Sequence, residues 1–269
     1  MSTATLEATA TQHRVGTVNQ PPIPFTRLLS VERRKMFDTR SGFWALMGVV
    51  VLSVIATGAT IIFGHRPDLK YGDFAKAVGI PTTVILPVLG ALAVSSEWGQ
   101  RTALTTFTLV PSRARVITAK FLVIVAVGIG SVAVALAAGA LGNLLNGAIA
   151  GITPVWNLPF VELLQIVLAD AIGMLMAFMF GALFRNSAAA VIGYFVYELV
   201  LPGVSEALAG SQAWWHSNAA WFDLRTATIP LYDTGMTAHQ WAQLGVSTLI
   251  WLVIPLAVAV RLVLRSEVK

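Results

Sequence analysis

The chain has 269 residues, of which 56% are hydrophobic and only 12% are charged, and its formal net charge is +5. Soluble domains usually carry about 25% charged residues, so this composition argues against a soluble protein and favours a membrane protein. The sequence contains no cysteine, which excludes disulfides, thiolate metal sites and a cysteine nucleophile. The basic residues lie beside apolar stretches, so the positive charge does not indicate a nucleic-acid partner.

Three regions follow one another along the chain. Residues 1–23 are rich in Thr, Ala, Gln and Pro without an apolar run, which predicts a disordered cytoplasmic tail and not a signal peptide. Residues 24–41 predict a short amphipathic helix. Residues 42–269 hold long apolar stretches and predict a transmembrane domain.

The amphipathic segment shows one apolar face. At about 100° per residue, Phe25, Leu28, Leu29 and Met36 share a side, and basic residues flank it. This pattern is typical of an interfacial helix whose apolar side lies in the lipid headgroup boundary. Glu32 falls inside the apolar face, and the pattern does not explain it.

Six stretches are long enough and apolar enough to approach the roughly 20 residues that cross a bilayer. They are about 43–63, 74–95, 117–141, 161–184, 188–208 and 242–264. Pro81 and Pro87 predict a kink or break in the second. Pro202 and Gly203 indicate that the fifth reaches only partway as one helix and ends as a re-entrant or second short helix. The expected fold is an all-α polytopic membrane protein.

The distribution of Lys and Arg predicts the orientation. With the N-terminus inside, fourteen of the 18 basic residues lie on the inner side, and only Arg66, Lys70, Lys76 and Arg225 lie outside. Such a bias predicts that both termini lie in the cytoplasm and that the chain spans the plasma (inner) membrane. Segment 96–116 is then a cytoplasmic loop, and segment 209–240 is extracellular.

The cytoplasmic loop 96–116 is far longer than the 2–8 residues that usually join two helices. Its part from Glu97 to Leu109 predicts a short helix that Pro111 ends. Apolar side chains such as Phe107 within a charged helix suggest a surface that binds a partner. Ordinary anchoring by positive charge on the inner side is the alternative.

The loop also carries a motif, in which Glu97, Gly99-Gln100-Arg101, Pro111-Ser112-Arg113 and Lys120 follow in order. It resembles the loop between the second and third spans of type-2 ATP-binding-cassette (ABC) exporter permeases. Family members more often carry Thr just after the glycine, where this chain has Gln100. The amphipathic helix and the six spans also resemble that family, so the likeness extends over about residues 25–265.

The resemblance implies a permease without its own ATPase. A separate cytoplasmic subunit would bind ATP and Mg²⁺, and two permeases, copies or paralogues, would pair with two such subunits. The sequence agrees in one respect, because it contains no G-x-x-x-x-G-K-[ST] phosphate loop. The cargo implied is a drug-like, peptide, lipid or ionic substrate moved outward by alternating access.

The family likeness assigns roles to two groups of residues. The expected coupling surface for the ATPase comprises Glu97, Gly99, Arg101, Phe107, Pro111, Arg113 and Arg115. The expected connecting helix, which would share the ATPase's motion, contributes Arg27, Leu28, Glu32, Arg34, Lys35 and Arg40.

Polar residues within the spans suggest a second site. Asp170 and Glu198 fall near mid-membrane, where a charge is costly and usually faces a cavity or a partner. They predict a cavity for a cationic or polar substrate, with Asn143 on an exit path. The alternatives are hydrogen-bonded structural acids, and for Asn143 a helix cap.

Two other classes of protein remain open at this point. A membrane anchoring or assembly protein without transport would share the charge pattern and topology. An integral-membrane enzyme would need a catalytic constellation at one membrane face. The sequence shows none, and the four histidines lack metal-ligand spacing, so no cofactor or metal is expected on this chain.

Overall fold

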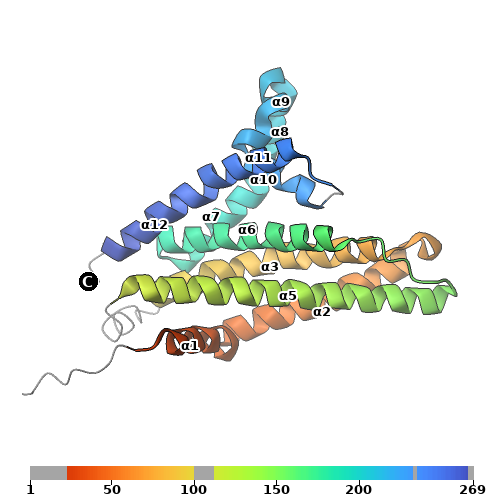
Figure 1. The fold of residues 1–269 in the computed structure, drawn as a ribbon, viewed down its shortest axis with the longest axis horizontal. Coiled ribbons are helices and arrows are strands. Elements are labelled where there is room, and N and C mark those ends of the chain that lie inside the picture. The colour runs from red at the N-terminus through yellow and green to blue at the C-terminus, as the bar shows by residue number, and fades with distance from the viewer. Residues whose placement is uncertain (1–22, 100–111, 233–234, 266–269) are drawn as a thin grey trace, which may run out of the picture.

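The computed structural model describes residues 23–99, 112–232 and 235–265 (Figure 1). Every regular element in these ranges is helical. Six of the described helices are long and apolar enough to cross a membrane. The predicted all-α fold with six candidate spans is therefore confirmed.

The helices fall into two sets. The first set comprises α1 (Phe25–Asp38), α2 (Arg40–Phe63), the 3-10 turn η1 (Arg66–Asp68), α3 (Tyr71–Gly99), α5 (Arg113–Ala150) and α6 (Phe160–Phe184). The second comprises α7 (Ser187–Phe195), η2 (Val196–Val200), α8 (Leu201–Ser211), α9 (Ala213–Phe222), α10 (Leu224–Thr228), η3 (Ile229–Tyr232), α11 (Ala238–Thr248), η4 (Leu249–Val253) and α12 (Ile254–Arg265). The fifth candidate span is α7, η2 and α8 in series, and the sixth is α11, η4 and α12.

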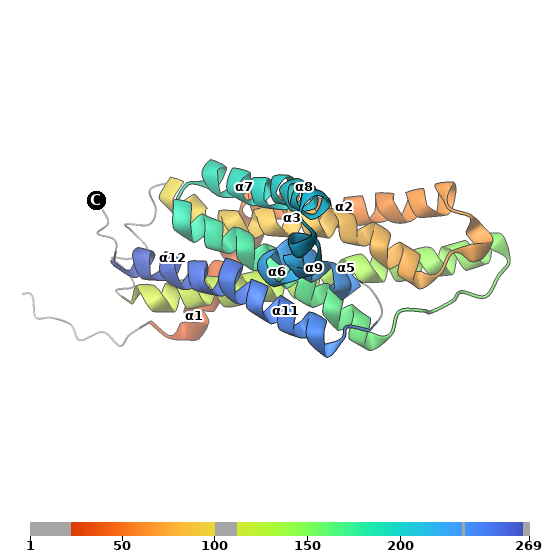
Figure 2. The ribbon, with the colours of Figure 1, turned by 90° about the horizontal axis from the view of Figure 1, so that it is seen from above.

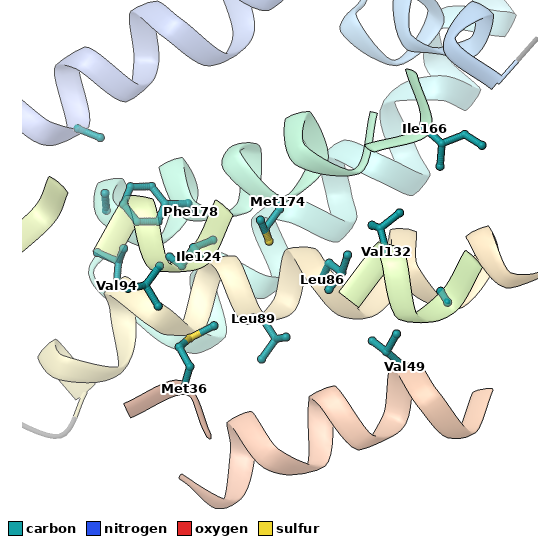
Figure 3. Packing of buried hydrophobic residues seen from close by; sticks show 14 of the residues in the cluster. Met36, Val49, Leu86, Leu89, Val94, Ile124, Val132, Ile166, Met174 and Phe178 are labelled. Atoms are coloured by element: carbon teal, nitrogen blue, oxygen red, sulfur yellow. The ribbon is translucent and has the colours of Figure 1, made fainter. Parts of the chain in front are cut away.

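Helix α3 lies at the centre of the bundle. It packs against α2, α5, α6 and α7, and Figure 2 shows α6 lying between α7 and α12. The core between these helices contains Leu86, Ile124, Met174 and Phe178 (Figure 3). Because lipid tails are as apolar as these side chains, packing between membrane-spanning helices is stabilised mainly by van der Waals contacts.

The bundle has two distinguishable ends. At the first, here called the basic end, α1 meets the last turn of α3 and the first turns of α5, and α5 in turn contacts the end of α12. An Arg113 Nη1–H group donates there to the Val263 carbonyl, across 3.2 Å. At the opposite end, the far end, the Tyr71 amide donates to the Val155 carbonyl. Figure 1 shows these two ends at opposite sides of the bundle.

Helix α5 is longer than a bilayer requires. Its 38 residues span roughly 57 Å at ~1.5 Å per residue, whereas the hydrocarbon core is about 30 Å thick. It therefore continues well beyond residue 141, where the sequence pattern placed the end of the span. Gly151 ends the helix with a positive φ of 68°, a conformation that glycine adopts without strain.

Helix α3 runs unbroken through Pro81 and Pro87, so the predicted break is absent. Pro87 has no N–H to offer the Thr83 carbonyl, four residues earlier. The Tyr194 hydroxyl, from α7, donates to that carbonyl instead, at 3.4 Å. A side chain from a neighbouring helix thus satisfies the backbone group that the proline leaves free.

The fifth span does not end partway either. Its helical course is kept by the π-turn η2, in which the Leu201 amide donates to the Val196 carbonyl. The sixth span contains the same device, because the Ile254 amide donates to the Leu249 carbonyl in the π-turn η4. In both spans a proline follows the π-turn by two residues. The π-turn hydrogen bonds, between residues five apart, keep each helix continuous up to the proline, which has no backbone N–H to donate.

Candidate functional site

Four charged side chains meet at the basic end and form what we call the charge cluster: Glu32, Lys35, Glu97 and Lys120. Lys120 Nζ lies 2.7 Å from Glu32 Oε2 and 2.8 Å from Glu97 Oε1. Lys35 Nζ lies 2.8 Å from Glu32 Oε1 and 2.6 Å from Glu97 Oε1. Each lysine therefore bridges both carboxylates, and the cluster joins α1, α3 and α5.

The position of Glu32 follows from the packing of α1. Leu28, Glu32 and Met36 are spaced by four residues, lie on one face and are buried. Leu28 packs against Val116 and Ala119 of α5. The apolar face expected to lie against lipid is thus partly covered by the chain itself. Glu32, which the sequence pattern left unexplained, lies on this face because Lys120 is its partner.

The buried charges of the cluster are paired with opposite charges. Lys120 is only 5% exposed and both glutamates are nearly as buried, and a buried charge is tolerated only with a partner. Two ammonium groups balance two carboxylates. Burial lowers the pKa of Lys35, but the neighbouring Glu32 and Glu97 carboxylates together raise it by more. The pKa of Lys35 therefore lies above its usual value. Lys35 therefore remains a cation at neutral pH.

The charge cluster flanks segment 100–111. Glu97 lies in the last turn of α3, which ends at Gly99, and Lys120 lies in the second turn of α5. Arg113 contacts α12 as described above, and Arg115 Nη2 donates to the Ile23 carbonyl just before α1, at 2.7 Å. Both ends of the segment are thus held to neighbouring helices.

The remaining residues of the two predicted groups divide as follows. Arg101, Phe107 and Pro111 lie outside the described residues, so their role stays a prediction. The side chains of the following residues are exposed on or beside α1: Arg27, Arg34 and Arg40. Lys120 was quoted in the sequence motif but not assigned to the coupling surface. The signal for it was a lysine at the start of a long apolar run.

A second site lies between α3, α6, η2, α10 and η3, where the helices enclose a cavity of about 590 Å³. Asp170 and Glu198 both line it, so the two predicted acids are brought together. Glu198 Oε1 lies 3.0 Å from Nε of Arg225, which α10 supplies. Sequence reasoning did not foresee Arg225 here, because it lies in the segment assigned to the outside.

Asn143 does not line this cavity. It is buried in α5, and its side-chain amide donates to the Val155 carbonyl at 3.1 Å. Asn146, one turn later, donates in the same way to the Arg66 carbonyl. Both amides hold the far-end loops against α5.

Comparison with known proteins adds one match. A family model described as "ABC-2 family transporter protein" matches residues 28–200. That range includes the charge cluster, Asp170 and Glu198, and it ends before Arg225. A comparison with curated proteins gave no match.

Proposed function

Since the chain belongs to the ABC-2 family of transporter membrane proteins, we propose that it is the transmembrane subunit of an ATP-driven exporter. A separate subunit binds ATP and Mg²⁺ and docks at the basic end, around segment 100–111. A second permease, either a copy or a paralogue, completes the assembly. Substrate passes outward as the pair alternates between inward- and outward-facing states.

The charge cluster is the observation that carries this proposal. Segment 100–111 is bounded by Glu97 on one side and by the start of α5 on the other, and Lys120 connects both to Glu32 of α1. Separating a buried ion pair is strongly unfavourable, at about 3–5 kcal/mol when one partner is lost. A displacement of the segment therefore moves α1, α3 and α5 together, without loss of their contacts.

The same displacement reaches the cavity through α3. Thr83 and Pro87 line the cavity. Glu97 lies about 15 Å beyond Pro87 along the same helix, at ~1.5 Å per residue. Because α3 is continuous between these positions, movement at the basic end changes one wall of the cavity. The opposite wall comes from η2, α10 and η3, which the charge cluster does not hold.

The orientation follows from charge. Arg27, Arg34, Arg40 and the basic residues at the start of α5 all lie at the basic end, and positive residues are retained on the cytoplasmic side. We therefore assign the basic end and both termini to the cytoplasm of a cell with this chain in its plasma (inner) membrane. The exposed basic side chains of α1 are then near lipid headgroups.

Purification from native membranes tests the proposal. The affinity-tagged chain, extracted in mild detergent, is expected to bring down a subunit that hydrolyses ATP, with the activity blocked by vanadate. An unrelated six-span protein with the same tag serves as the control. If the chain purifies as a stable complex or monomer with no ATP-hydrolysing subunit, the exporter assignment is wrong and an anchoring or assembly role takes its place.

A further inference from the structure

The cavity between α3, α6 and η2 contains one deep carboxylate that is not balanced by a cation. Asp170 is 5% exposed, and its Oδ1 atom has no hydrogen-bond partner in the part of the chain that the structure describes. Glu198, in contrast, is paired with Arg225. The other charged residues that line the cavity lie closer to solvent: Asp73 and Lys76, which are exposed, and Glu162, which is half-buried.

Three tyrosines line the same cavity as this carboxylate: Tyr194, Tyr197 and Tyr232. The Tyr194 hydroxyl already donates to the Thr83 carbonyl, and the Tyr194 and Tyr197 rings are in contact, with centroids 6.4 Å apart. Tyr232 is neutral, because burial raises its pKa and the charge of Asp170 raises it further. The wall thus offers aromatic surface without added charge.

From this arrangement we infer, on the basis of the proposed function, that the exporter's substrate is a protonated amine with an aromatic or apolar body. The ammonium group donates to Asp170, and the body lies among the tyrosine rings. A charge-assisted hydrogen bond to a desolvated carboxylate is among the stronger polar contacts, and a cation near aromatic faces gains further. The cavity volume of about 590 Å³ lies within the roughly 300–1,000 Å³ of small-molecule sites.

The chemistry of the walls disfavours other ligand classes. An anion would have to displace Glu198 from Arg225 and would also meet Asp170. A divalent metal needs several oxygen, nitrogen or sulfur ligands, and the described residues hold no group of three or more His, Cys, Asp or Glu side chains close enough to share an ion. Asp170 Oδ1, an acceptor without a partner among the described residues, suits one N–H donor.

Two matched fluorescent probes test the inference on the purified full-length chain in lipid nanodiscs, without any ATPase. Dansylcadaverine carries a protonated primary amine on an aromatic body, and its N-acetyl derivative keeps the body but lacks the charge. Binding is measured by fluorescence anisotropy against empty nanodiscs. We expect the wild-type chain to bind the amine at least about tenfold more tightly than the acetylated probe, since one hydrogen bond to a charged group is at stake.

Two variants then locate the charge. Asp170→Asn is expected to weaken amine binding roughly ten- to hundredfold and to leave binding of the acetylated probe unchanged. Glu206→Gln, an exposed carboxylate of α8 that does not line the cavity, is the matched control and is expected to change neither. If Asp170→Asn fails to fold, the comparison of the two probes on the wild-type chain still tests whether the cavity prefers a protonated amine.

Equal binding of both probes by the wild-type chain would overturn the inference, as would full amine affinity in Asp170→Asn. Displacement of the amine by Na⁺ but not by K⁺ at equal ionic strength would also overturn it, in favour of an inorganic ion site. Because no ATPase is present, these outcomes are independent of the co-purification that tests the exporter assignment.

Discussion

Lys120→Met is expected to destabilise the folded protein by about 3–5 kcal/mol. The Lys120 side chain is 5% exposed and pairs with both Glu32 and Glu97. Of the two lysines that bridge the buried carboxylates, Lys35 would remain, and its side chain is 39% exposed. Unfolding of the purified chain in mixed micelles, followed by circular dichroism as denaturing detergent increases, measures the loss.

Two further variants isolate the charge effect. Arg34→Met replaces an exposed residue of α1 and should stay within about 0.5 kcal/mol of the wild type. In Lys120→Met/Glu32→Gln one lysine again faces one glutamate, so this double variant should regain more than half of the lost stability. If the double variant loses as much stability as Lys120→Met and Glu32→Gln lose when measured singly and added, the charge cluster does not act as a unit.

Gly90→Val/Gly181→Val is expected to remove a large part of the chain's stability and to lower the yield of folded protein. A Cβ atom at Gly181 would lie 2.6 Å from the Ala91 carbonyl oxygen, and one at Gly90 would collide with the Met174 carbonyl. Both contacts are between the backbones of α3 and α6, which cannot move aside as a flexible side chain would. Overpacking costs about 1–3 kcal/mol at each site, against a total stability of about 5–15 kcal/mol.

Gel filtration of the solubilised chain reads out this prediction as the yield of monodisperse protein. Gly130→Val is the control, because a Cβ atom at this α5 position meets nothing within 4 Å. Equal yields from the double variant and the control would mean that α3 and α6 do not approach as closely as described.

The spans themselves were predictable, because long apolar runs need no knowledge of tertiary contacts. The depths of Asp170 and Glu198 could also be counted along their helices; both residues line one cavity, and their role toward a substrate stays a prediction. These features depend on one segment at a time. They can therefore be predicted from the local sequence.

Several features that sequence reasoning missed depend on residues far apart in the chain. Glu32 makes sense only once Lys120, 88 residues later, is beside it. Of the kink or break expected in α3, the break is absent, and the carbonyl that Pro87 leaves free accepts from Tyr194, 111 residues after Thr83. Arg225 pairs with Glu198 only because α10 folds back over the cavity. No local pattern records such pairings.

Cross-linking from a single cysteine tests the central claim, that the ATP-binding subunit docks at segment 100–111. The chain has no cysteine of its own, so Arg101→Cys and, at the far end, Lys70→Cys each introduce one thiol. In the native complex, treated with a short cross-linker that carries a maleimide and a photoreactive group, position 101 should cross-link to the ATP-binding subunit and position 70 should not. A cross-link from position 70, or none from position 101 in an intact complex, would contradict the account.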